Sequence, residues 1–190
     1  MSQYYDYWEN VISKNGFPAD ELISALQKSI RRGWEENALS VAYEMYMTSP
    51  DFEDYMWKRL MVISVEDIGF GDTHAPIFIK TLNDMRREFE PSAVDRALFF
   101  VHAIRYLCKA EKERSSDLHV NIVKKEFELI ARRPEIHDFM RDKHTRKGRA
   151  LGRGEEHFYN ECIVLNPLKE GCQEEALDRI KKLLEMEKSR

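Results

Sequence analysis

The sequence lacks the patterns that most readily assign a chemistry. Its 190 residues contain no G-x-x-x-x-G-K-[ST] phosphate-binding loop and no G-x-S-x-G nucleophile elbow. Neither a backbone cradle for nucleotide phosphates nor a hydrolase site of that kind is therefore predicted. No run of about eighteen apolar residues occurs, and the first residues lack the basic-then-apolar order of a secretory signal. We expect a cytoplasmic protein that does not enter a membrane.

Cysteine is scarce as well. The three cysteines are Cys108, Cys162 and Cys172, and no two of them have C-x-x-C spacing. An odd number with this spacing argues against a disulfide framework and against a zinc knuckle. We expect reduced thiols, no bound metal and no cofactor.

Charged residues are plentiful, but neither sign is in large excess. They make up 34% of the chain, and the net charge is only -4. Bulk charge of this kind does not indicate a nucleic-acid binder, so only a local basic patch could contact DNA. The length suits one domain, or one domain with an appendage, and is sufficient for a substantial core.

The hydrophobic pattern is helical almost everywhere, and no alternating strand pattern persists for more than a few residues. Start signals at Pro18, Ser49 and Pro50 and a stop signal at Gly33 mark boundaries. The predicted helices cover residues 18–33, 35–48, 50–68, 73–89, 91–108, 115–130 and 174–187. Short connections between successive helices favour an all-α antiparallel helical bundle.

Two of these helices are predicted in more detail. The third has one apolar stripe through Phe52 and Ile63 and another through Trp57 and Ile68, so we expect it to be the buried central helix. The fifth is expected to begin at Pro91. The residues predicted to face inward along it are Val94, Leu98, Val101 and Leu107 or Cys108.

Two segments resemble a known family. Residues 22–33 read Leu-Ile-Ser-Ala-Leu-Gln-Lys-Ser-Ile-Arg-Arg-Gly, and residues 59–69 read Arg-Leu-Met-Val-Ile-Ser-Val-Glu-Asp-Ile-Gly. Together they resemble the helical region that follows the ATPase module in the replication-associated recombination protein A (RarA, also called MgsA) family, AAA+ relatives of the clamp loaders. Further similar segments lie at 99–107, 134–137, Thr145 and 151–154.

The resemblance implies a fold like the clamp-loader collar and a non-catalytic oligomerisation or interaction module in DNA replication, recombination and repair. In that family the region holds together a homotetramer that acts at stalled forks. It thus implies a homo-oligomer, dimer or tetramer, and a separate AAA+ ATPase chain as a partner. The motif residues that it nominates for interaction are Lys28, Arg31, Arg59, Glu66, Asp67 and Gly69.

Aromatic residues also favour self-association. The sequence has more large aromatic side chains than one small bundle can readily bury, among them Trp8, Trp34 and Tyr46.

Composition divides the chain into three parts. Residues 1–16 form an aromatic arm, and residues 17–132 form the helical, collar-like domain. Residues 133–190 contain a basic loop interrupted by glycines and a C-terminal helix, which we expect to pack on the same domain.

The charges of the two motifs complement each other. Glu66 and Asp67 are predicted in the last turn of the third helix, where the helix dipole disfavours negative charge by about 0.3–1 kcal/mol each. Lys28, Arg31 and Arg32 carry the opposite sign at the end of the first helix. We predict an ion-pair network that joins the two helix ends. An acidic site for a binding partner is the alternative.

Residues 141–153 are strongly basic, with six Lys or Arg against one Asp. Such cations neutralise phosphates, and the nearby Phe158 and Tyr159 could stack on unpaired bases. The loop therefore predicts weak, sequence-independent contact with DNA, and a solvated or intersubunit surface is the alternative. The candidate residues are Arg141, Lys143, His144, Arg146, Lys147, Arg149 and Arg153.

Two other functions stay open from the sequence. One is a stand-alone helical adaptor that binds DNA or protein without an ATPase. The other is a metal-dependent phosphohydrolase of the HD type, because His137-Asp138 is the dipeptide that names that all-helical class. Its ligand set would need completion by His102 or His119 upstream and by Asp142 or Asp178 downstream.

Overall fold

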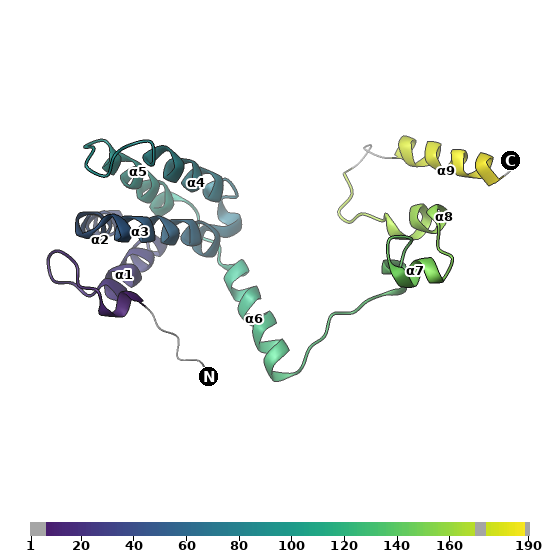
Figure 1. The fold of residues 1–190 in the computed structure, drawn as a ribbon, viewed down its shortest axis with the longest axis horizontal. Coiled ribbons are helices and arrows are strands. Elements are labelled where there is room, and N and C mark those ends of the chain that lie inside the picture. The colour runs from purple at the N-terminus through teal and green to yellow at the C-terminus, as the bar shows by residue number, and fades with distance from the viewer. Residues whose placement is uncertain (1–6, 170–173, 189–190) are drawn as a thin grey trace. The chain divides into compact units, whose positions relative to one another are not determined.

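The computed structural model describes residues 7–169 and 174–188, and over these ranges the chain is all-α. The only β structure within them is an isolated bridge between Ile12 and Pro18. The predicted fold class is therefore confirmed (Figure 1). No helix in the described part of the chain is both long and apolar enough to cross a bilayer.

The chain divides into two compact units, Met1–Ala131 and Arg132–Arg190. The division falls next to the predicted boundary between residues 132 and 133. The expectation that the second part packs on the first stays a prediction, and each unit is described by itself.

The first unit is a helical bundle with one helix that leaves it (Figure 1). Its helices are α1 (Ala19–Arg31), α2 (Glu35–Thr48), α3 (Pro50–Ile63), α4 (Ala75–Arg86), α5 (Arg96–Lys109) and α6 (Ser115–Leu129). Shorter turns complete it: 3-10 turns at Tyr7–Asn10 and Gly69–Gly71, and a π-helical turn at Ser64–Ile68 that continues directly from α3.

Helix α3 is the central helix, as predicted. Ser49 caps its start by accepting a hydrogen bond from the backbone N–H of Phe52 at 3.1 Å, and Pro50 occupies the first turn. Helices α1, α2, α4 and α5 all contact it. Its fully buried apolar side chains form the middle of the core, and they are Phe52, Met56, Trp57, Leu60 and Ile63.

The predicted inward face of the fifth helix is wrong at its start, although Leu107 and Cys108 at its end are buried as predicted. Helix α5 begins at Arg96, not at Pro91, and Val94 and Leu98 are 91% and 63% exposed. In place of Val94 and Leu98, the face that enters the core carries Phe100, Ala103 and Ile104.

A buried ion cluster explains this shift. The Arg96 guanidinium lies 3.0 Å from the Glu53 carboxylate of α3, and it also donates to the backbone carbonyls of Arg86, at 2.8 Å, and Phe89. Arg86 of α4 pairs with the same carboxylate at 3.4 Å and with Asp54. Because burying Arg96 satisfies the end of α4, it fixes where α5 starts and which face turns inward.

The described part of the aromatic arm packs against the core of the bundle. Trp8 stacks on Phe52 with ring centroids 4.7 Å apart, and it also contacts Tyr55 at 4.8 Å. Tyr4 and Tyr5, which also belong to the predicted arm, lie outside the described residues.

The second unit is small and loop-rich. Its helices are α7 (Arg146–Ala150), α8 (Glu155–His157) and α9 (Glu174–Lys188), with a 3-10 turn at Asp138–Met140 and a π-helical turn at Phe158–Cys162. Lys188 of α9 pairs with Glu156 of α8 at 2.5 Å. Gly148 is the one buried residue in the described part of this unit.

Candidate functional site

Asp67 is the centre of the predicted ion-pair network. Its side chain is completely buried in the π-helical turn after α3. The carboxylate accepts from Arg31 Nε at 2.6 Å, from Arg114 Nη1 at 3.0 Å and from Gln27 Nε2 at 2.9 Å. Three charge-assisted or polar hydrogen bonds compensate for the burial of this charge. Asp67 therefore joins the end of α1 to the residue that precedes α6.

Glu66 extends the same network toward solvent. Its carboxylate contacts Arg31 at 3.3 Å, Arg114 at 3.2 Å and, more distantly, Arg59 at 3.9 Å. The Arg59 guanidinium also donates to Gln27. Glu66 is only partly buried, so its contribution is more screened than that of Asp67.

The nominated residues do not all take part. Lys28 donates to Ser24 within its own helix, and Arg32 lies over the ring of Trp34 with its guanidinium carbon 5.6 Å from the centroid. Sequence reasoning missed Arg114. It is distant in the chain, and its only local signal is that it stands just before a helix whose first turn contains Asp117, to which it donates at 2.7 Å.

Gly69 allows the segment before α6 to lie against this turn. Its φ of +51° is in the left-handed region, and a Cβ at this position would collide with the backbone carbonyl of Glu113. The backbone N–H of Glu113 in turn donates to the carbonyl of Asp67 at 3.0 Å. The Glu-Asp-Ile-Gly motif therefore holds the chain at the point where α6 leaves the bundle.

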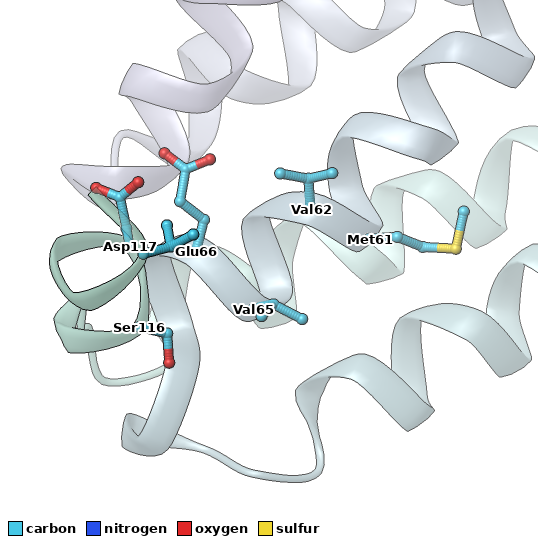
Figure 2. A pocket seen from close by; sticks show the side chains of 7 residues that line it. Met61, Val62, Val65, Glu66, Ser116 and Asp117 are labelled. Atoms are coloured by element: carbon cyan, nitrogen blue, oxygen red, sulfur yellow. The ribbon is translucent and has the colours of Figure 1, made fainter. Parts of the chain in front are cut away.

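An apolar groove of about 550 Å³ lies beside this network (Figure 2). One wall comes from α3 and the π-helical turn and the other from the start of α6. Its apolar residues are largely open to solvent, with Val62 42% and Val65 50% exposed. The lining residues are Met61, Val62, Val65, Glu66, Ser116, Asp117 and Val120.

Helix α6 contains no buried residue, although much of it is apolar. Helical spacing sorts these residues onto two faces. The groove stripe, which continues from the groove, consists of Val120, Val123, Phe127 and Ile130; the far stripe consists of Leu118, Ile122 and Leu129. Their exposed fractions range from 45% at Val123 to 77% at Leu129. The antiparallel stack predicted for the whole chain thus does not extend to α6.

In the second unit, most of the basic loop is engaged within the unit itself. Lys143 pairs with Glu155 at 2.8 Å and lies over the ring of Phe158. His144 contacts Asp142 at 2.7 Å, and this interaction is the main cause that lowers the pKa of the Asp142 carboxyl. Phe158, proposed above as a base-stacking residue, instead packs against both loop side chains, including the edge of His144.

Two arginines of the loop serve as internal donors. Arg149 donates to the backbone carbonyls of Lys143, at 3.2 Å, and His144, at 2.9 Å. Arg153 donates to the carbonyl of Arg141 at 2.9 Å and forms an ion pair with Asp138 at 2.5 Å. These contacts hold the loop in a compact conformation through bonds within the second unit.

Arg141, Arg146 and Lys147 are the basic residues of the loop whose side chains form neither an ion pair nor a hydrogen bond in the described part of the chain. Of these, Arg141 is half-buried, whereas Arg146 and Lys147 are exposed at the start of α7. Thr145 caps this helix by accepting from the N–H of Gly148 at 2.9 Å. Any contact of the loop with a phosphate backbone would therefore rest mainly on Arg146 and Lys147.

The two side chains of the His137-Asp138 dipeptide contact different groups. His137 stacks on Phe139 and lies 3.6 Å from Glu135, while the carboxylate of Asp138 pairs with Arg153. The bond from Arg153 is the main cause that lowers the pKa of Asp138. Over the described ranges, no three His, Cys, Asp or Glu side chains form a group that could hold a metal ion.

Both cysteines that the structure describes are free thiols. Burial raises the pKa of Cys108 to about 11. Cys162 lies 3.4 Å from His157 Nδ1, but burial and the neighbouring Asp142 raise its pKa as well. Raised values leave little thiolate at neutral pH, so neither resembles an activated nucleophile. Cys172 lies outside the described residues.

A scan against models of known protein families finds no match for this chain, and no curated protein matches it either. The resemblance of residues 22–33 and 59–69 to the RarA family accordingly stays a prediction.

Proposed function

We propose that this chain is a non-catalytic assembly module of the cytoplasm, similar to the post-ATPase region of RarA-type proteins, and that α6 is the element through which it associates. The observation that carries the proposal is the uncovered apolar surface of α6 and the adjoining groove. Exposed patches of this kind in a water-soluble fold mark interaction sites, because contact with water is unfavourable by about 25 cal/mol per Å².

The ion-pair network supports the proposal. Asp67 accepts from Arg31 and from Arg114, and Gly69 permits close packing of Glu113. These contacts fix both ends of the turn from which α6 projects. A helix held rigidly at its base loses little conformational freedom when a partner binds, which favours association.

The proposed partners are further copies of this chain and, by the family resemblance, a separately encoded AAA+ ATPase. A neighbouring open reading frame for such an ATPase without its own C-terminal part would support the second partner. The chain alone is expected to hydrolyse neither ATP nor phosphomonoesters.

Light scattering across a hundredfold dilution tests the assembly role. We expect the mass of a dimer or tetramer at micromolar concentration. Val123→Asp together with Phe127→Asp places two charges on the groove stripe and is expected to give a monomer. Val94→Asp is the control, because Val94 is an exposed valine, 91% accessible, that lies far from α6 in the chain. A monomeric mass for the unmodified protein at every concentration would overturn the proposal.

Contact with DNA is a narrower second proposal, supported by the open side chains of Arg146 and Lys147. Each phosphate that they neutralise would contribute a log-log salt slope of about 0.7–0.9. Replacing both by Ala should therefore reduce the slope by about 1.4–1.8. Arg149→Ala is the control, because Arg149 donates within the loop. No measurable binding at low salt would exclude the DNA contact and leave the assembly role untouched.

A further inference from the structure

The groove stripe and its flanking charges specify how a second α6 would pack against the first. Ser116, Val120, Val123 and Phe127 follow one another at intervals of four, three and four residues. This is the spacing of the core positions in a two-helix interface. The polar side chains that border the stripe are Asp117 and Lys124 on one side and His119 and Glu126 on the other.

An antiparallel pairing brings opposite charges together along one border of the stripe. When Ser116 faces Phe127 of the second copy and Val120 faces Val123, Asp117 lies beside Lys124 of that copy. On the other border, His119 then lies beside Glu126 of the second copy. Opposed helix dipoles add to this preference.

A parallel pairing loses these contacts. In it, Lys124 would face His119 of the second copy, a pair with no opposite charges, and the groove would have no large side chain to receive. Charge complementarity therefore selects the antiparallel arrangement.

The groove supplies a matching cavity. Ser116 is small and lines the groove together with Met61 and Val65, so it leaves space there for a larger side chain (Figure 2). In the antiparallel register, Phe127 of the second copy is the residue that meets this space. Two-fold symmetry means that each chain fills the groove of the other, as an isologous interface requires.

We infer that two copies of this chain associate through antiparallel α6 helices, with Phe127 of each copy seated in the groove of the other. The inference rests on the proposed assembly function and names its contact. The far stripe, with Leu118 and Leu129, stays outside this pairing.

Site-specific disulfides test the register in the full chain, with the three native cysteines replaced by Ala. His119→Cys and Glu126→Cys proteins are prepared separately, mixed and oxidised. The antiparallel pairing places residue 119 beside residue 126 of the other copy, so only the mixture should form a covalent dimer. In a parallel, in-register pair, residue 119 and residue 126 of the other copy would be offset by about 10.5 Å along the helix axis, beyond the roughly 7 Å between Cα atoms that a disulfide spans.

The outcomes separate this inference from the proposed function. A covalent dimer in the mixture alone supports the antiparallel pairing. A disulfide between His119→Cys and Lys124→Cys proteins, which face each other only in the parallel pairing, would indicate parallel helices and overturn it. Association by light scattering without any disulfide would place the contact elsewhere and also overturn it. A monomer in every assay would overturn the assembly function itself.

A size exchange provides a second test. Phe127→Ser empties the groove and should raise the dissociation constant about thirtyfold or more. Ser116→Phe fills the groove from within and should weaken association similarly. The double variant restores one large and one small residue at each contact and should recover affinity. Leu129→Ser, on the far stripe, is the matched control and should leave the disulfide of the mixture unchanged. Failure of the double variant to recover affinity would contradict the register.

Discussion

At the scale of single residues, Asp67 is the charged residue of the motif whose removal should destabilise the fold most. It is fully buried, and its carboxylate receives Arg31, Arg114 and Gln27. Removing one partner of a buried pair leaves the other charges uncompensated. The same deletion at a partly exposed position allows water to replace the lost contact.

We therefore expect Asp67→Ala to lower the free energy of unfolding by about 3 kcal/mol and Glu66→Ala by about 1 kcal/mol or less. Urea denaturation followed by circular dichroism measures both. Equal losses for the two variants would show that burial does not distinguish them.

Glu113 predicts a pH dependence at the same site. Hydrogen bonds from Ser115 are the main cause that lowers the pKa of this carboxyl below its usual 4.5, and the N–H of Phe70 adds to it. A lowered folded-state pKa contributes stability above pH 4.5 that is lost as the pH falls through the folded value. The stability difference between the wild type and Glu113→Gln should therefore shrink from pH 6 to pH 3. Denaturation midpoints at several pH values measure it, and a constant difference would contradict this role.

The network illustrates how far sequence could predict the site. Opposite charges at two predicted helix ends were sufficient to pair Arg31 with Glu66 and Asp67. Arg114 could not be found in that way, because its contact with Asp67 spans 47 residues and depends on the path of the loop before α6. Lys28 has the right sign and the right helix but points toward Ser24.

At the scale of elements, the turn after α3 depends on glycine for two separable reasons. Gly69 has a positive φ and also lies against the Glu113 backbone, whereas Gly16 has a positive φ of 89° with no atom near its missing Cβ. Gly69→Ala should cost about 3 kcal/mol, and Gly16→Ala about 1 kcal/mol. Thermal denaturation of both variants isolates the steric part. Similar losses would mean that the turn moves aside without penalty.

The helices show where hydrophobic pattern succeeds and where it fails. Helix α3 was predicted well because it is apolar on two sides, so its burial does not depend on an exact phase. The start and the first inward residues of α5 were predicted wrongly, because they depend on Arg96. Hydropathy counts a buried arginine as a surface residue. The apolar residues of α6 predicted a helix correctly. Pattern alone does not say whether the surface that covers them belongs to the same chain or to another.

At the scale of the whole molecule, the two units should differ in independence. The core and both ion clusters lie within residues 7–131. A chain that ends at residue 131 should therefore retain a helical circular dichroism spectrum and a cooperative thermal transition. Calorimetry of this shortened chain provides the test. Loss of the transition would show that the second unit is needed for the first to fold.

The near absence of buried side chains in the second unit has a consequence for hydrogen exchange. In its described residues only Gly148 is buried, and loop bonds such as those of Arg153 hold the backbone together. Its amides can exchange with solvent deuterium through small local openings, which require little free energy. Amides in the middle of α3 are enclosed by four helices and should exchange only when the first unit unfolds as a whole. A single deuteration time course should thus show two groups of amides, one in each unit, with widely separated exchange rates.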